Sequence, residues 1–342
     1  MHIATPSGFD IYSTDGGANW RSELVPLPAG RRVKTISVVL DPGGTAHFAV
    51  SAVVHGPQNA STERASRGYW ELLYVRRNPD GAWTSAENVL RGRPEWAEPA
   101  NDDDVLADSV RIMADDQRNL HVTWHGTAKD RIYGNDYAYY AFRAADGAGG
   151  WRDTWEAPQM LVPADPARGI KHSFAPSLAV DGDLAVALAF YDVFDGKRWA
   201  GFDSVARIVR HGRLDGPPIP VAQWVRGSID AHRPEAALAT RFPAIAPRLY
   251  HAADRRVWLD VLQTLIPMGF PEAPNLIVYQ RVDLSPWLSG SSHGGDKVAT
   301  APSQVPAPVP AASAERPADG TVLFTMGDIL AFLPNLISRF RH

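Results

Sequence analysis

The sequence predicts an all-β protein: a β-propeller of four-stranded antiparallel blades, followed by a Pro/Ala-rich linker and a C-terminal amphipathic helix. Two repeated patterns predict the blades. A turn followed by an apolar strand returns about every 70 residues, and an aromatic strand, in most copies with an Asp-Gly turn, comes after it. Repeats of this length, each with several short strands, are typical of propellers. The 28 Gly and 28 Pro among 342 residues agree with frequent turns.

The first pattern begins with an Asp-containing turn and continues into a strand. Its four copies begin at Asp41, Asp115, Asp181 and Asp254. The second pattern has its clearest copies at residues 12–20, 74–83 and 140–151, with a weaker copy at 279–283. Asp-Gly between two alternating runs predicts a hairpin, because Gly accepts the positive φ of a tight turn.

Together the two patterns predict four strands per unit. Complete units cover residues 33–90, 109–162 and 174–222. A unit at 241–287 lacks a recognisable last strand, and the N-terminal piece at 2–27 lacks the first. Because propellers close by combining strands from both ends of the chain, this count leaves five or six blades open.

Composition divides the chain into three regions. Residues 1–290 form the propeller, and residues 291–319, rich in Pro, Ala and Ser, form a flexible linker. Residues 320–342 place apolar side chains at helical spacing, namely Met326, Ile329, Leu330, Leu333, Leu336, Ile337 and Phe340. This amphipathic helix predicts docking to a protein partner or anchoring at a membrane surface. A helix that folds back onto the propeller is the alternative.

Charge and composition exclude several classes of function. With 34 Lys+Arg against 38 Asp+Glu, the formal net charge is -4, which argues against a nucleic-acid binder. The absence of Cys excludes disulfides, thiolate zinc sites and a Cys nucleophile. The N-terminal residues show neither the basic nor the apolar region of a signal peptide. We therefore expect a cytoplasmic protein, with non-classical export or a truncated N-terminus left open.

Residues 13–20 fit the pattern Ser-x-Asp-x-Gly-x-x-Trp, with Ser13, Asp15, Gly17 and Trp20 at its defining positions. This pattern resembles the Asp box, or BNR repeat, of the sialidase-like β-propeller superfamily. The expected role is structural. The Asp15 carboxylate accepts backbone hydrogen bonds, Gly17 takes a positive φ, and Trp20 packs on the blade.

The resemblance covers about residues 1–287 and implies a protein directed at glycans. Sialidases grip a carboxylate with three arginines and use a Tyr nucleophile assisted by Glu, with an Asp acid/base. Their first arginine lies in an Arg-Ile-Pro motif before the first Asp box. That motif is absent here, and the nearest match is Arg241-Phe242-Pro243. Whether the chain is an enzyme stays open; if it is, the resemblance implies an exo-sialidase-like glycoside hydrolase.

Ligand sites in propellers gather at one end of the ring, in the loops between blades. Three long polar loops combine Arg, a carboxylate and Trp or His, at residues 91–104, 165–173 and 224–235. Trp offers a flat face to a sugar ring, while Arg and Asp reach its hydroxyl or carboxylate groups. The candidate ligand-binding residues are Arg168, Arg226, Arg233, Trp96, Trp224 and His172. A glycosidase needs two facing carboxylates. The candidate catalytic residues are Asp102, Asp230 and Glu95.

No cofactor is expected, and one metal interpretation stays open. The run Asp102-Asp103-Asp104 could hold Ca²⁺, although it lacks the spaced ligands of a calcium loop. His121 and His125 would lie ~13 Å apart on a strand, too far to share one ion, so we expect them to be ordinary strand residues.

Two functions follow from these patterns. The first is a glycan-directed propeller that binds or hydrolyses a terminal glycosidic linkage. The second is a non-catalytic protein-interaction scaffold, recruited to a partner or surface by residues 320–342. Two converging carboxylates would favour the enzyme, shallow Trp-lined sites a lectin, and an apolar pocket without paired carboxylates the scaffold.

Overall fold

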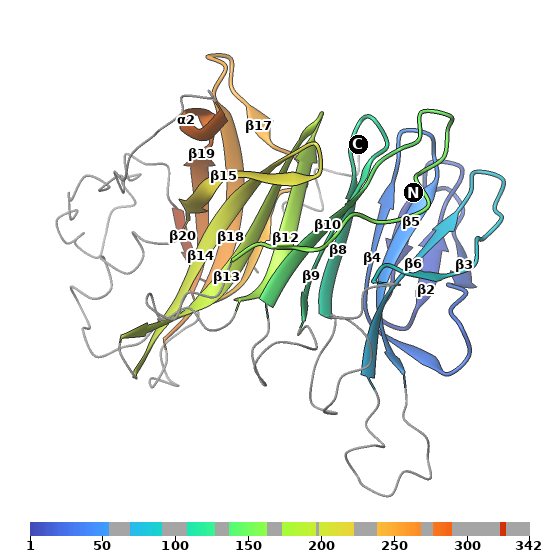
Figure 1. The fold of residues 1–342 in the computed structure, drawn as a ribbon, viewed down its shortest axis with the longest axis horizontal. Helices are drawn as coiled ribbons and strands as arrows, with labels where there is room; N and C mark the ends of the chain where they lie inside the picture. The colour runs from blue at the N-terminus through green and yellow to red at the C-terminus, as the bar shows by residue number, and fades with distance from the viewer. Residues whose placement is uncertain are drawn as a thin grey trace, which may run out of the picture.

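Five antiparallel sheets form the described part of the chain, and they stand side by side in chain order (Figure 1). We number them sheet 1 to sheet 5 from the N-terminus. The computed structural model describes residues 1–54, 69–90, 108–126, 137–162, 173–195, 198–221, 238–267, 276–288 and 322–325. Within these ranges, no helix has both the length and the apolar character needed to cross a membrane.

The first four sheets each pair their strands in sequence order. Sheet 1 consists of β1 (His2–Ala4), β2 (Phe9–Tyr12) and β3 (Arg21–Leu24). Sheet 2 consists of β4 (Arg31–Leu40), β5 (Ala46–Val54), β6 (Tyr69–Arg77) and β7 (Glu87–Asn88). Sheet 3 consists of β8 (Asp108–Ala114), β9 (Leu120–Gly126), β10 (Tyr137–Arg143) and β11 (Gln159–Met160). Sheet 4 consists of β12 (Ser173–Asp181), β13 (Leu184–Asp195), β14 (Arg198–Arg210) and β15 (Arg213–Pro220).

Sheet 5 takes its last strand from the C-terminal region. It consists of β16 (Leu238–Ile245), β18 (Val257–Pro267), β19 (Leu276–Asp283) and β20 (Val322–Thr325), with β17 (Tyr250–His251) pairing with β18. The short helix α2 (Ser285–Leu288) follows β19. The helix predicted over 320–342 is therefore wrong at 322–325. This β-branched and aromatic stretch suits a strand, and the edge of β19 offers it backbone partners. Residues 326–342 and the linker at 291–319 lie outside the described residues.

The repeated turns occur where the sequence predicted them. The turns that begin at Asp41, Asp115 and Asp181 join the first two strands of sheets 2, 3 and 4. Gly81 and Gly147 of the Asp-Gly turns have φ of 89° and 76°, the conformation for which Gly is suited. Sheet 1 has only three strands, as predicted for the N-terminal piece, and β2 carries the tyrosine that precedes the second turn pattern.

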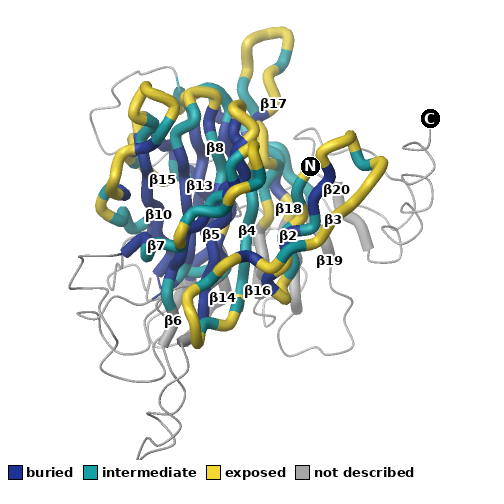
Figure 2. The backbone as a smooth tube through the Cα atoms, turned by 90° about the vertical axis from the view of Figure 1, so that its right-hand side faces the viewer, coloured by how far each residue is buried: buried dark blue, intermediate teal, exposed yellow. Residues whose placement is uncertain are grey.

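The sheets bury their faces against one another. All seven residues of β10 are buried, which means that both faces of sheet 3 are covered. In Figure 2 the strands labelled β5, β10 and β13 are mostly buried, whereas many turns are exposed. Four apolar clusters fill the spaces between neighbouring sheets, around Phe48 (sheets 1 and 2), Trp124 (2 and 3), Tyr140 (3 and 4) and Leu259 (4 and 5). Apolar contact is thus the main link from sheet to sheet.

The first strands of sheets 2 to 5 lie next to one another and are joined by hydroxyl groups. Strand β4 lies beside β8, β8 beside β12, and β12 beside β16. The Ser37 Oγ accepts a hydrogen bond from the N–H of Ile112 at 3.2 Å, and the Ser177 Oγ accepts one from Ile245 at 3.3 Å. Hydroxyls of one first strand therefore satisfy backbone donors at the edge of the next.

A partly exposed polar cluster joins sheets 1 and 2. The carboxylate of Glu23 on β3 accepts hydrogen bonds from the Tyr12 hydroxyl at 2.7 Å and from the Trp83 Nε1 at 3.1 Å. The Arg77 guanidinium lies 3.3 Å from the same carboxylate and 3.7 Å over the Tyr12 ring. One carboxylate thus holds a tyrosine of its own sheet and an arginine and a tryptophan of the next.

The same cluster returns between sheets 2 and 3. Glu87 on β7 accepts hydrogen bonds from Arg143 and from the Trp155 Nε1. The Arg143 guanidinium lies 5.4 Å over the ring of Tyr74, which corresponds to Tyr12. We call each such contact between two sheets a seam, and its polar residues a Tyr–Glu–Arg–Trp cluster.

We expect Ser37→Ala to lower the free energy of unfolding by about 1 kcal/mol, because the N–H of Ile112 loses its acceptor. Urea unfolding followed by Trp fluorescence measures this change. Ser22→Ala, at an exposed position of β3, is the matched control and should change stability by less than about 0.5 kcal/mol. Equal effects of the two substitutions would contradict the role given to the hydroxyl.

Candidate functional site

The first strands of sheets 2 to 5 all begin at the same end of the strands, on one side of the row of sheets. Neighbouring strands of an antiparallel sheet run in opposite directions. The start of the first strand therefore lies beside the end of the second strand, the start of the third and the end of the fourth. Segments 91–107, 163–172 and 222–237 each connect the fourth strand of one sheet to the first strand of the next. The strands that flank these segments therefore end and begin at this end, which we call the entry end.

The predicted site residues lie outside the described residues. They are Glu95, Trp96, Asp102, Arg168, His172, Trp224, Arg226, Asp230 and Arg233. Their roles stay predictions, as does calcium binding at Asp102-Asp103-Asp104. In the part of the chain that the structure describes, no group of three or more His, Asp or Glu side chains is placed to hold a metal ion.

Each first strand of sheets 2 to 5 carries an irregularity near the entry end. The register with the second strand shifts between Val33 and Thr35, Asp108 and Arg111, Phe174 and Ser177, and Arg241 and Ala244. Within one of these bulges Ser109 has φ of 50°, an uncommon value for a residue with a side chain. Bulges of this kind re-aim side chains and occur often beside active sites.

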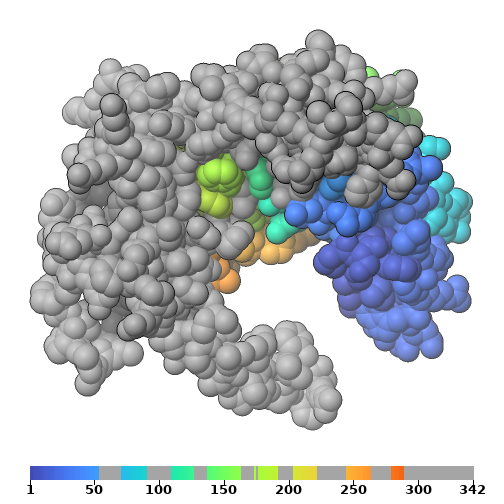
Figure 3. All heavy atoms as spheres, turned by 90° about the horizontal axis from the view of Figure 1, so that it is seen from below, coloured from blue at the N-terminus to red at the C-terminus, as the bar shows by residue number. Residues whose placement is uncertain are grey.

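Aromatic rings gather near the entry end of sheets 3 and 4. The ring of His125, near the end of β9, meets Phe174 of β12 at 6.0 Å, and Phe174 meets Phe190 at 5.4 Å. Trp124 and Tyr139 stack with ring centroids 5.7 Å apart. In Figure 3, which looks from below, described atoms from several sheets are visible near the middle of the view.

An arginine at the start of β4 is held by an ion pair. Arg31 donates from Nε and Nη2 to the two carboxylate oxygens of Glu71 on β6, at 3.0 and 3.2 Å. This bidentate geometry fixes the guanidinium, which leaves less of it to bind a ligand. Exposed cationic side chains follow on the same first strands at Arg32, Lys34 and Arg111.

The two histidines lie on a strand, as predicted. His121 and His125 both belong to β9. The His121 ring is buried, and its Nδ1 lies 2.8 Å from the hydroxyl of Tyr140. His125 instead contacts an aromatic ring of sheet 4. The two side chains thus serve different contacts.

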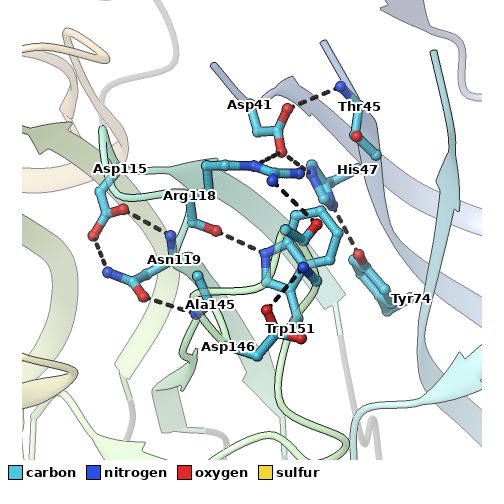
Figure 4. A network of polar contacts seen from close by, with 12 residues as sticks. Asp41, Thr45, His47, Tyr74, Asp115, Arg118, Asn119, Ala145, Asp146 and Trp151 are labelled. Carbon is cyan, nitrogen blue, oxygen red and sulfur yellow. Dashed lines mark hydrogen bonds and ion pairs between the residues drawn. The ribbon is translucent and has the colours of Figure 1, made fainter. Parts of the chain in front are cut away.

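The opposite end of sheet 2 holds a buried Asp–His–Tyr network (Figure 4). The Asp41 carboxylate accepts the N–H of Thr45 at 2.8 Å and lies 3.4 Å from the His47 Nε2. The His47 Nδ1 lies 2.7 Å from the hydroxyl of Tyr74. Arg118 reaches across from sheet 3 and donates to Asp41 at 2.7 Å.

Sheet 3 repeats this network at the corresponding positions. Asp115 accepts the backbone N–H and the side-chain amide of Asn119, both at 2.7 Å, and lies 3.5 Å from the His121 Nε2. His121 in turn contacts Tyr140. The equal spacing of Asp41 to His47 and of Asp115 to His121 is a sequence signal that could have predicted the pair.

The network has the electrostatics of a structural element. Burial would raise the pKa of Asp41, but hydrogen bonds from His47, Arg118 and Thr45 outweigh it and hold that pKa well below its usual range. Burial lowers the pKa of His47 and raises that of Tyr74, so both are neutral at pH 7. A buried neutral tyrosine with no access to solvent is a poor nucleophile, so we assign these residues to stability.

The Ser13–Trp20 turn has most of the predicted local geometry. The Asp15 carboxylate accepts the backbone N–H of Asn19 at 2.9 Å, and the hydroxyl of Ser13 donates to it at 2.8 Å. These bonds, from Asn19 first, lower the pKa of Asp15 to about 2. Gly17 has φ of 97°. Trp20, however, is 43% exposed, so the prediction that it packs on the blade is wrong in this structure.

No protein-family model and no curated protein matches the chain. The similarities are to solved structures. An alpha-L-arabinanase of Penicillium chrysogenum, complexed with arabinobiose, is 12% identical over 80% of each chain, with a TM-score of 0.41. A sialidase of Trypanosoma rangeli is 11% identical over 81% of this chain and 43% of its own, at a TM-score of 0.41. Zg3597, a family 117 glycoside hydrolase of Zobellia galactanivorans, is 14% identical over 81% and 74%, at 0.41.

We expect acid to destabilise the fold through His47. Its pKa is lowered in the folded state, so below about 6.5, the ordinary value, the unfolded chain binds a proton that the folded chain does not. The free energy of unfolding therefore falls as pH falls through this window. Asp41, whose pKa is also lowered, adds the same trend below about 3.8.

Urea unfolding at pH 7.5 and pH 5.5 measures this dependence. His47→Gln should cost about 1–2 kcal/mol at pH 7.5 and should lose less stability on acidification than the unmodified chain. His211→Asn is the control, because His211 is exposed in the turn between β14 and β15 and Asn tolerates its positive φ. A control that flattens the pH dependence as much as His47→Gln would rule out this assignment.

Proposed function

We propose that the chain is a glycan-directed β-propeller that binds or hydrolyses a terminal glycosidic linkage at the entry end. The observation that carries the proposal is the topology. The three segments richest in Arg, carboxylate and Trp or His each lead into a first strand, and these strands all begin at the entry end. The ends of the strands that flank these segments thereby lie on one side of the row, which supports a site there.

The bulges also favour the entry end as the place where a ligand binds. Four first strands depart from regular pairing near the entry end, whereas at the opposite end short turns join the first and second strands of sheets 2, 3 and 4. Irregular strand starts turn side chains away from the sheet plane, which is how a scaffold presents functional groups. The aromatic rings of His125, Phe174 and Phe190 give this end a rigid support.

The residue types of the three segments suit sugar chemistry. Trp96 and Trp224 offer faces for a pyranose ring, and Arg168, Arg226, Arg233 and His172 supply donors for hydroxyl or carboxylate groups. For hydrolysis, one of Asp102, Asp230 and Glu95 would protonate the leaving oxygen, and a second would act as nucleophile or activate water. Their separation would set the outcome: about 5–5.5 Å for retention and about 6.5–9.5 Å for inversion.

A broad glycan array, read for retained protein and for loss of terminal sugars, tests the proposal. Loss of a terminal sugar identifies a glycosidase, and retention without loss identifies a lectin. If the folded full-length chain is neither retained on the array nor removes a terminal sugar, a glycan-directed function is contradicted. That result favours a protein-interaction scaffold.

Where a sugar is lost, we expect Asp102→Asn or Asp230→Asn to lower kcat by about 10²-fold or more, because an amide neither donates nor accepts the reacting proton. Asp183→Asn, in the exposed turn between β12 and β13 at the opposite end, is the matched control and should stay within about twofold. Full activity of both test variants would remove these residues from the mechanism.

Where a sugar is bound, we expect Arg226→Ala and Trp224→Ala each to weaken binding by about tenfold or more. Isothermal titration with the sugar found on the array measures the loss. Arg213→Ala, an exposed arginine of β15, is the control for a general loss of positive charge. A comparable loss in the control would point to non-specific attraction.

A further inference from the structure

Two partly exposed rings meet at the entry end of sheets 3 and 4, where β9 and β12 lie side by side (Figure 1). The His125 and Phe174 ring centroids are 6.0 Å apart in an edge-to-face contact. The buried Phe190 supports Phe174 from the next strand at 5.4 Å. On the strands of these two sheets, every other ring whose side chain the structure describes is buried. The pair is therefore held in place while part of each ring stays accessible.

The face of sheet 3 that meets sheet 4 also carries polar side chains beside the rings. Thr123 pairs with Tyr140, which belongs to the apolar cluster between these sheets, and with Arg111 on β8. His125 follows Thr123 by two residues, so Arg111, Thr123 and His125 share this face. The Thr123 side chain is buried, and its Oγ1 has no hydrogen-bond partner among the described residues. Because a buried hydroxyl without a partner costs free energy, this face favours a polar ligand group that offers one.

Arg111 keeps hydrogen-bond donors for a ligand. Its side chain is exposed, and its Nη1 donates to the carbonyl of Val110 at 2.8 Å, which restrains the guanidinium. Among the described residues it forms no ion pair. Arg31, in contrast, is held by both carboxylate oxygens of Glu71. Since a guanidinium carries five N–H donors, most of those of Arg111 remain for other partners.

The backbone is irregular at these same residues. The register shift of sheet 4 begins at Phe174, and that of sheet 3 ends at Arg111. Ser109, within the second bulge, has φ of 50°. Bulges re-aim side chains, and strained backbone of this kind clusters at ligand sites. In the sequence, Phe174 follows the predicted ligand-binding residue His172 by two positions. The connecting segment 163–172 therefore leads directly to this ring.

We propose that Phe174, His125 and Arg111 form one subsite for a sugar ring. The Phe174 ring packs against the C–H groups on one face of the sugar, and His125 and Arg111 form hydrogen bonds with hydroxyl groups at its edge. A pyranose or furanose suits this arrangement, because its faces are apolar and its edge carries hydroxyls. The subsite rests on the proposed glycan-directed function, and it adds residues of the strands to those of the connecting segments.

Chemical labelling of histidine tests the position of the subsite in the unmodified full-length chain. Diethyl pyrocarbonate modifies accessible histidines, and mass spectrometry of peptides locates each modified residue. The probe is the glycan retained most strongly on the array, added at about ten times its Kd. We expect it to slow the modification of His125 by about fivefold or more, because an occupied subsite covers the ring. His211, exposed in the turn between β14 and β15, is the internal control and should react at an unchanged rate.

Two substitutions test the contacts separately. Phe174→Leu removes the ring but keeps an apolar side chain, and Arg111→Gln removes the charge but keeps a long polar side chain. Each should weaken binding of the same glycan by about three- to tenfold in isothermal titration. Tyr250→Leu and Arg213→Gln, both exposed and at the opposite end, are the matched controls and should stay within about twofold. Urea unfolding checks that all four variants are folded, and an equal loss in the controls would overturn the proposal.

The outcomes separate the subsite from the proposed function. If the unmodified chain retains no glycan on the array, the glycan-directed function fails, and the subsite fails with it. If a glycan is retained but His125 reacts equally fast with and without it, only the subsite is overturned. Binding by Phe174→Leu and Arg111→Gln that equals binding by the unmodified chain would likewise overturn the subsite alone, and the sugar would then be bound by the connecting segments.

Discussion

Each central sheet of this chain is apolar on both faces, and its position depends on that constraint. A sheet such as sheet 3, with every residue of β10 buried, cannot lie with one face in water. It needs a neighbour on each side, and the four apolar clusters supply those neighbours in chain order. The short turns and the entry end then lie on two opposite sides of the row, because the strands run perpendicular to the direction in which the sheets are stacked.

Polar groups refine the arrangement that the apolar contacts produce. The Tyr–Glu–Arg–Trp clusters place a carboxylate between two sheets. The side chains of Glu23 and Glu87 are 41% and 35% exposed, so solvent screens their ion pairs with arginine. Their main effect is geometric, since Glu23 and Glu87 each fix one sheet against the next at a single register. The hydroxyls of Ser37 and Ser177 act similarly at the first strands, where an unsatisfied backbone N–H would be costly.

Much of the fold could be predicted from local sequence signals. Asp-Gly turns and recurrent aromatic strands specify hairpins through φ preferences and alternation, and the sheets contain them at the expected places. The strand β20 could not be predicted in this way, because four residues at 322–325 follow a long Pro-rich stretch and precede a helical spacing of apolar residues. Its strand conformation depends on the edge of β19.

Less of the candidate site than of the fold could be predicted from the sequence. Residue types and spacing suggest sugar chemistry, but which carboxylates face each other depends on how several distant segments converge. The exposure of Trp20 shows the same limit at a smaller scale, since its turn forms through local hydrogen bonds that do not bury the Trp20 ring. The Asp41–His47 and Asp115–His121 pairs, in contrast, repeat at equal spacing and were readable from the sequence.

The outer strands of sheets 2, 3 and 4 have a consequence for behaviour at high concentration. Strands β7 and β11 are two residues long, and β15 contains Pro217, Pro218 and Pro220, which have no N–H to donate. A sheet edge that is short or lacks donors is a poor template for pairing with another polypeptide. The outer edges of sheets 2, 3 and 4 are thereby protected against edge-to-edge association and the fibrous aggregates that grow from it.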